Sequence, residues 1–286
     1  MNKKWYRLAF QQKDPIHIGK GSYGVIAETR VFIPGWTIWG ALVNKYISEK
    51  GRAEENIKRS QILFETISCF YPSIEKTGDV LFPGYSNGSF CLGTKLNNTF
   101  FNEEDFRAIF TDTFVSTAID AISQAAKKES LHEIELILPK TKEAIGESHK
   151  NLFWVGVLGI DNENIDVIDF LHEGLTIYVG GERRYGFGKM ELVYKLEIRE
   201  EELESWGLDL EGRPASDQVL RNYMEYCDNA LISGEIEHVI IEADFSRATP
   251  RVIDSKICIT PGSIAKASGL LKKGVFIQQN VKLNYL

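Results

Sequence analysis

The sequence predicts an α+β protein, with a ferredoxin-like (RRM-like) domain over residues 1–198 and a smaller, degenerate α+β lobe over residues 199–286. The first observation is the order of patterns, which is strand, helix, strands, helix, strand rather than the strict alternation of a doubly wound sheet. The second is an acidic segment after about residue 198, which is typical of a linker. The third is the length of 286 residues, 43% of them hydrophobic, which suffices for two such units.

The first hundred residues predict two strands, two helices and a loop-rich region. Apolar and polar residues alternate as in half-buried strands up to Pro34, and apolar residues then recur every three or four positions until Gly51. Pro, Gly and Asn pairs interrupt the region that follows the helices. The expected order is a strand over 5–14, a strand over 25–33, helices over 37–51 and 56–70, and loops over 72–98.

Short strands dominate the remainder of the chain. β-branched and aromatic residues gather in runs that turn residues separate, which is typical of strands. Two helical patterns interrupt these runs, one in each predicted unit. We expect strands over 114–120, 131–139, 151–160, 175–181, 189–198 and 238–244, and helices over 165–172 and 217–231.

The charge is unevenly distributed along the chain. The net charge is −7, yet residues 1–60 hold eleven Lys or Arg and five acidic residues, so their own net charge is +6. The other 226 residues therefore carry −13. A basic region beside acidic stretches can bind a polyanion on one face, although solvated charge without a partner explains the pattern equally well.

The cysteines and the hydropathy pattern point to a reduced, cytoplasmic protein. Cys69, Cys91, Cys227 and Cys258 are scattered singly, which predicts neither a disulfide framework nor a zinc site. No apolar run approaches the ~18 residues of a membrane span. The charged N-terminal residues do not resemble a signal peptide.

The first glycine cluster, GKGSYG, has the G-x-G-x-x-G spacing of nucleotide-binding loops at Gly19, Gly21 and Gly24. A dinucleotide fold requires a helix directly after the glycines, whereas here the helix begins a dozen residues too late. A protein kinase requires a V-A-I-K lysine and an H-R-D loop, and the chain contains neither motif. Nucleotide binding is therefore not the expected role of this cluster.

A second glycine cluster, GGERRYGFGK, combines flexibility with charge and aromatic rings. Glycines allow close approach to a ligand, arginines bind phosphate and stack, and aromatic rings stack on bases. The alternative is a tight hairpin turn whose aromatic side chains belong to the core. The residues in question are Gly180, Gly181, Gly186 and Gly188 together with Arg183, Arg184, Tyr185, Phe187 and Lys189. This set suits single-stranded RNA.

Three segments resemble the RAMP superfamily of CRISPR-associated proteins. HIGKGSYG followed by IPGWTIWGAL is similar to the family's N-terminal signature, and GGERRYGFGKMEL to its glycine-rich loop. STAIDAISQAAKKESLHEIELILP resembles its central strand pair, with Ser130 in place of the usual glycine. The segments occur in the family's order across roughly residues 5–195. The resemblance implies a ferredoxin-like RAMP domain and a role in a type III effector complex of antiviral defence.

The superfamily includes backbone subunits that cut target RNA, endonucleases that process the guide precursor, and cap subunits that hold the 5′ tag of the guide. Between the first glycines and the helix the only acidic residue is Glu28, so the aspartate that a slicing backbone subunit uses is absent. A processing enzyme would recruit His17 as general acid or base, although a lone histidine is more often structural. Asp120 is expected to be a turn or cap residue.

The cap role is the one we expect from the resemblance. It implies a non-catalytic subunit without metal or cofactor that binds the crRNA, contacts target RNA indirectly, and neighbours other RAMP subunits and the large signature subunit. CITPGSIAKASG would be the second lobe's turn, but LKKGVFIQ is a reduced second glycine loop and a departure from the family. Trp36 and Trp39 would stack on RNA or a partner, or at least one would be buried. Phosphate contacts are expected from Lys13, His17, Lys20, Arg30 and Lys45, and base contacts from Arg183, Arg184, Tyr185, Phe187 and Lys189.

Overall fold

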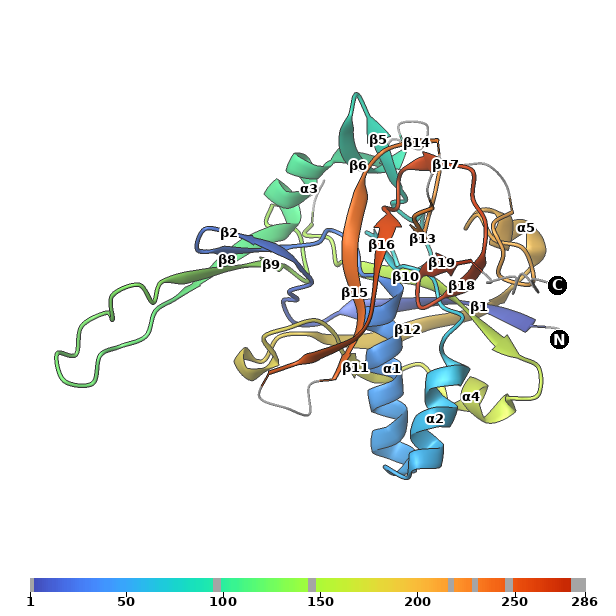
Figure 1. Ribbon diagram of the computed structural model, residues 1–286, viewed down its shortest axis with the longest axis horizontal. Helices are drawn as coiled ribbons and strands as arrows, with labels where there is room; N and C mark the ends of the chain where they lie inside the picture. Colours follow the sequence, from blue (N-terminus) through green and yellow to red (C-terminus); the bar gives the residue numbers. More distant parts are fainter. Residues whose placement is uncertain are drawn as a thin grey trace, which may run out of the picture.

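A five-stranded antiparallel sheet forms the centre of the molecule (Figure 1). In this computed structural model, the described residues are 3–94, 99–143, 148–215, 219–227, 231–244 and 249–278. The central strand β1 pairs with β10 over nine residues and with β12 on its other edge. The sheet order is β11 (Thr176–Tyr178), β12 (Lys189–Ile198), β1 (Lys3–Gln12), β10 (Phe153–Asp161) and β4 (Tyr71–Ser73).

Three helices pack beside this sheet. They are α1 (Gly35–Lys50), α2 (Glu54–Leu63) and the short α4 (Ile165–Phe170). The ring of Tyr46 on α1 lies 5.8 Å from Phe64 and 5.3 Å from Phe170, which ties the three helices together. The second predicted helix, over 56–70, needs correction at both ends, because α2 begins at Glu54 and ends at Leu63. The chain after Leu63 extends toward the sheet.

The start of α1 also contacts the C-terminal part of the chain. Gly35 approaches Gly274 so closely that a Cβ on either residue would overlap the other backbone. Trp39 is buried, and Trp36 packs on Tyr223 with ring centroids 5.0 Å apart. The expectation that at least one of the two tryptophans is buried is therefore confirmed.

A second, mostly antiparallel sheet is built from the C-terminal residues. Its order is β15 (Ile236–Asp244), β16 (Arg251–Ile259), β13 (Tyr223–Glu225), β19 (Val275–Ile277) and β18 (Leu270–Lys272), and β14 (Ile232–Ser233) pairs with β17 (Ile264–Ala265) nearby. The helix predicted over 217–231 is wrong in its described part, where Tyr223 and Met224 form a buried strand instead. Tertiary burial of these two side chains overrides the helical pattern.

Two smaller sheets extend from the body. One has the order β2 (Gly19–Tyr23), β3 (Ile26–Thr29), β9 (His132–Ile137) and β8 (Thr111–Ser116), and Figure 1 shows the β8–β9 connection projecting away from the rest of the chain. The other contains β5 (Pro83–Ser86), β6 (Ser89–Thr94) and β7 (Thr99–Asn102), followed by α3 (Glu103–Phe110). About half of the described residues in the predicted loop region 72–98 thus lie in strands β4, β5 and β6.

The acidic segment after residue 198 lies against the first sheet. It forms α5 (Glu200–Glu204), and Trp206 and Leu208 beyond it are buried. The indole Nε1 of Trp5 donates a hydrogen bond to the carbonyl oxygen of Leu210 at 2.9 Å. Buried residues from both predicted units form one hydrophobic cluster, and the division at residues 198 and 199 stays a prediction.

Of the helices in the described ranges, none combines the length and the apolar character that crossing a membrane requires.

Candidate nucleic-acid interface

The second glycine cluster is hydrogen-bonded to Pro15 and His17, which lie just before the first cluster and about 160 residues earlier in the sequence. The backbone N–H of Gly181 donates to the carbonyl oxygen of His17 at 3.0 Å, and that of Gly188 donates to Pro15 at 2.9 Å. The first cluster leads into the β2–β3 hairpin, and the second connects β11 to β12 through the 3-10 turn Arg183–Tyr185. We call the surface formed by residues 17–24 and 180–189 the glycine-loop surface.

Two glycines of the second cluster are required by geometry. Gly180 has φ +75°, and a Cβ there would overlap the carbonyl oxygen of His17. Gly188 has φ +101°, and a Cβ there would overlap the carbonyl oxygen of Val179. In contrast, nothing lies within 4 Å of a Cβ built on Gly21, so that position is open surface. Gly180 therefore permits the close approach to His17, and Gly188 permits the close approach to Val179.

Three aromatic rings lie on this surface. Tyr185 and Phe187 have ring centroids 6.0 Å apart, and Phe114 from β8 lies 5.0 Å from Tyr185 and 5.7 Å from Phe187. Tyr185 is 47% exposed, so it is not a core residue of a tight hairpin. Sequence reasoning missed Phe114, whose only signal was its place in a β-like run, because the β8–β9 pairing that brings it here is not local.

The predicted cations of this surface differ in what they contact. Arg183 donates from Nη2 to the carbonyl oxygen of Tyr178 at 2.8 Å. Within the described ranges, neither Arg184 nor Lys189 forms an ion pair. Lys20 lies 3.5 Å from Glu103. Arg183, Arg184 and Lys189 are therefore cations of the surface without a carboxylate partner in the described ranges, and of these three side chains only that of Arg183 is held by a hydrogen bond to a backbone carbonyl.

His17 is fixed between the two clusters. Its Nδ1 lies 2.8 Å from the carbonyl oxygen of Glu135, which can only accept, so Nδ1 carries the proton of the neutral ring. Its ring faces Gly19 and Gly181, because a Cβ on either glycine would be 3.7 Å from the imidazole. The Nε2 atom is then the free acceptor of the neutral imidazole.

Three other predicted contact residues are held by carboxylates. Lys13 lies 3.4 Å from Glu191. Lys45 pairs with Glu49 at 2.8 Å on α1, which places it outside the glycine-loop surface. Arg30 forms a two-oxygen ion pair with Glu237, and it also donates to the hydroxyl of Tyr223 at 3.0 Å. The role of these three in phosphate binding stays a prediction.

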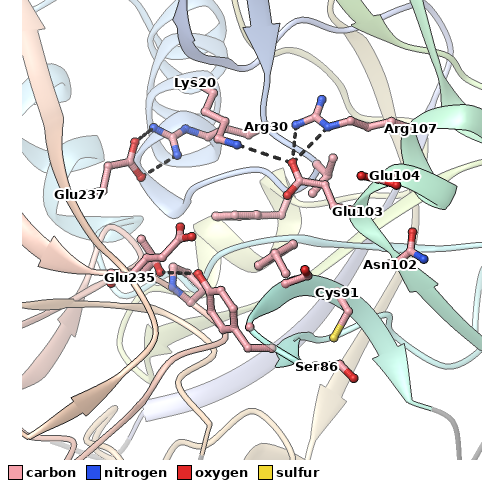
Figure 2. Close-up of a pocket in the computed structure, with 18 of the residues that line it drawn as sticks. Lys20, Arg30, Ser86, Cys91, Asn102, Glu103, Glu104, Arg107, Glu235 and Glu237 are labelled. Atoms are coloured by element: carbon pink, nitrogen blue, oxygen red, sulfur yellow. Dashed lines mark hydrogen bonds and ion pairs between the residues drawn. The ribbon is translucent and has the colours of Figure 1, made fainter.

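Arg30 joins the β2–β3–β9–β8 sheet to the C-terminal sheet rather than pointing into solvent. Its side chain is only 10% exposed, and Figure 2 shows its guanidinium against the carboxylate of Glu237. Burial opposes the positive charge, but the hydrogen bond and the charge of Glu237 outweigh it, and the pKa of Arg30 is raised. The pair therefore serves as a link between β3 and β15.

A cavity of about 780 Å³ opens beside the first cluster (Figure 2). Lys20 and Arg30 line it from the N-terminal part, Glu103 and Arg107 from α3, and Glu235 from the segment before β15. Arg107 pairs with both Glu103 and Glu135 at 2.6 Å, which fixes α3 against β9. This cavity has no local signal in the sequence, because its walls come from segments that are far apart in the chain.

The remaining predicted features concern metal sites and turns. Among the residues that the structure describes, no three His, Cys, Asp or Glu side chains gather as metal ligands. Asp120 accepts hydrogen bonds from the backbone N–H groups of Ile122 and Ser123 at 3.1 and 2.8 Å. It is the turn-capping residue that the sequence predicts.

Comparison with known proteins shows similarity in structure alone. No known protein-family profile and no curated protein matches the sequence. The fold is similar to a chain of the "Type III-B Cmr-beta bound to cognate target RNA", with a TM-score of 0.60 and 14% identity over 91% of this chain and 86% of that one. A chain of the "Type III-B Cmr-beta bound to cognate target RNA and AMPPnP, state 1" has a TM-score of 0.57 and 15% identity, over 91% of this chain and 86% of that one. The chain thus has the mixed, sheet-dominated α+β fold of these subunits.

Proposed function

We propose that this protein is a non-catalytic, RNA-binding RAMP subunit of a type III CRISPR effector complex, and that it holds the 5′ tag of the crRNA. The observation that carries the proposal is the hydrogen bonding of the second glycine cluster to the residues just before the first, beside an aromatic group in which Tyr185 is exposed. The likeness in fold to chains of an RNA-bound type III-B complex supports the class of protein.

The topology of the main sheet supports the RAMP part of the proposal. Its strands lie in the order β12, β1, β10, β4, with α1 after the first strand in sequence and α4 after the third. A ferredoxin-like fold is built from a β-α-β-β-α-β unit, so this arrangement supports that part of the proposal. The glycine-rich loop precedes the last strand of that unit, which is the place that the family resemblance implies.

The chemistry of the surface suits an RNA strand with unpaired bases. Tyr185, Phe187 and Phe114 offer ring faces on which bases stack, each stack contributing about 1–3 kcal/mol. Arg184 and Lys189 supply uncompensated positive charge for phosphates, and the glycines let the strand approach the backbone. The subunit in this proposal binds and positions the guide, and base pairing by the guide reads the target.

A processing endonuclease is the second candidate, because of the hydrogen bond that fixes His17. With Nδ1 protonated, Nε2 could accept a proton from a ribose 2′-hydroxyl near the glycine-loop surface. That function predicts metal-independent cleavage of a repeat hairpin that His17→Ala abolishes. A backbone subunit along the guide is the third role that the superfamily allows.

The test is to purify the protein with the products of its genomic neighbourhood and to sequence the RNA crosslinked to it. We expect crosslinks at the 5′ end of a uniform set of guides, mapping to the glycine-loop surface. Crosslinks spread along the spacer would assign a backbone subunit, and crosslinks at a cleaved repeat stem would assign processing. Recovery of no RNA would contradict the proposal and leave a scaffold role.

A further inference from the structure

The cavity beside the first glycine cluster has a lining that does not favour phosphate. Five of its lining residues are acidic and three are basic, so the lining carries a net charge of −2. Each basic side chain already has carboxylate partners. They are Glu237 for Arg30, Glu103 and Glu135 for Arg107, and Glu28 and Glu103 for Lys20. The acidic residues are Glu28, Glu103, Glu104, Glu235 and Glu237. A phosphate would meet net repulsion here, whereas an uncharged group with hydrogen-bond donors would not.

Aromatic rings form one wall of the same cavity. Phe32 and Phe90 are stacked, with centroids 6.2 Å apart at an interplanar angle of 30°. Tyr85 meets Phe90 edge-on, with centroids 5.8 Å apart. Flat apolar faces combined with a few polar groups are the usual lining of a site for a planar heterocycle. The volume of about 780 Å³ lies within the range of pockets that take such ligands.

Glu235 is the lining carboxylate beside the aromatic wall, where it interacts with the side chain of Tyr85. It forms no ion pair with any residue in the described part of the chain, in contrast to Glu103 and Glu237. Figure 2 shows it on the wall opposite Glu103. Because a carboxylate only accepts hydrogen bonds, its ideal partner presents two adjacent N–H groups.

We propose that this cavity binds one unpaired guanine of the guide RNA, an inference that rests on the proposed function. Guanine alone among the four bases presents two adjacent donors, N1–H and the 2-amino group, to a carboxylate such as that of Glu235. Adenine and cytosine place an acceptor beside the amino group, and uracil has one N–H between two carbonyls. Lys20 at the same cavity matches the guanine O6 and N7 acceptors, which lysine commonly binds.

The test uses free nucleosides with the full-length protein, so that it does not depend on the glycine-loop surface. Isothermal titration with guanosine and inosine compares two ligands that differ only in the 2-amino group. We expect guanosine to bind roughly 5- to 150-fold more tightly than inosine, the factor for one good two-point contact to a base. Glu235→Gln should remove this preference, whereas Glu204→Gln on α5, also exposed but outside the cavity, should keep it.

Equal affinity for guanosine and inosine, or no effect of Glu235→Gln in a variant with unchanged melting temperature, would overturn the inference. Tighter binding of N-acetyl-arginine amide than of guanosine, lost in Glu235→Gln, would do so as well, since it would assign the cavity to a basic side chain of a protein partner. An Arg183→Ala/Arg184→Ala variant separates the two proposals. If it keeps guanosine selectivity while wild-type protein yields no RNA crosslinks, the proposed function fails and the cavity's base selectivity stands.

Discussion

Removing both arginines of the 3-10 turn should reduce the salt dependence of RNA binding. If Arg183 and Arg184 each neutralise one phosphate, the slope of log K against log salt for single-stranded RNA should become shallower by about 1.4, which is 0.7 for each contact. Between 50 and 200 mM salt, wild-type affinity should then fall roughly sevenfold more than that of the double alanine variant. Fluorescence anisotropy of a labelled guide RNA over this salt range measures the slope directly.

The control for this experiment removes the same charge elsewhere. Arg52 and Lys58 are exposed at the α1–α2 end of the molecule and are not part of the glycine-loop surface. An Arg52→Ala/Lys58→Ala variant should therefore keep the wild-type slope. If both double variants changed the slope equally, the effect would be one of net charge alone. If neither changed it, the assignment of the loop to phosphate binding would be refuted.

Three further outcomes test the framework that holds the interface. Gly180→Ala should lower the melting temperature and the free energy of unfolding by at least about 1–2 kcal/mol, the cost of left-handed backbone, whereas Gly21→Ala should be nearly neutral. Glu237→Gln, which leaves Arg30 without its carboxylate, should cost about 1.5–3 kcal/mol in urea unfolding at pH 7, and a cost near zero would contradict the linking role. Burial raises the pKa of the Cys69 thiol from 9.0 to about 12. The contribution of Cys69 to the free energy of unfolding is therefore complete below pH 9 and is lost as the pH rises toward 12. Chemical unfolding of the wild type and of Cys69→Ala across this pH range measures the loss.

The long strands of the main sheet and helix α1 were predictable because their signals are local. The strands over 5–14, 151–160 and 189–198 correspond to β1, β10 and β12, and the helix over 37–51 corresponds to α1. Each has enough length for its apolar period to be seen in the sequence. The periodicity therefore predicts the elements that position the glycine-loop surface.

The elements that sequence reasoning missed depend on distant partners. β13 is only three residues long, and Tyr223 is buried there because it contacts Trp36 and the Arg30–Glu237 pair. The β5–β7 sheet occupies a stretch in which Gly, Pro and Asn outnumber the strand signals. In both cases tertiary pairing, rather than local propensity, decides the structure.

The candidate site likewise has one part with a local sequence signal and another part that depends on contacts between distant segments. The glycines and the cations of residues 180–189 could be found as a motif, but their contact with His17 could not, since it joins segments about 160 residues apart. Phe114 reaches the surface through β8, and Glu235 reaches the cavity through the segment before β15. Composition therefore indicates the chemistry of the site, and the topology assembles it.

The ion pairs change what the basic N-terminal region can do. Its formal charge of +6 suggests a surface that attracts RNA on its own. In the structure, however, Lys13, Lys20 and Lys45 lie within 3.5 Å of carboxylates, and Arg30 is buried against one. The uncompensated charge that remains at the glycine-loop surface is small, so long-range attraction by the isolated chain is weak. Under the proposed function, affinity would then come from stacking and from the avidity of neighbouring subunits on one guide.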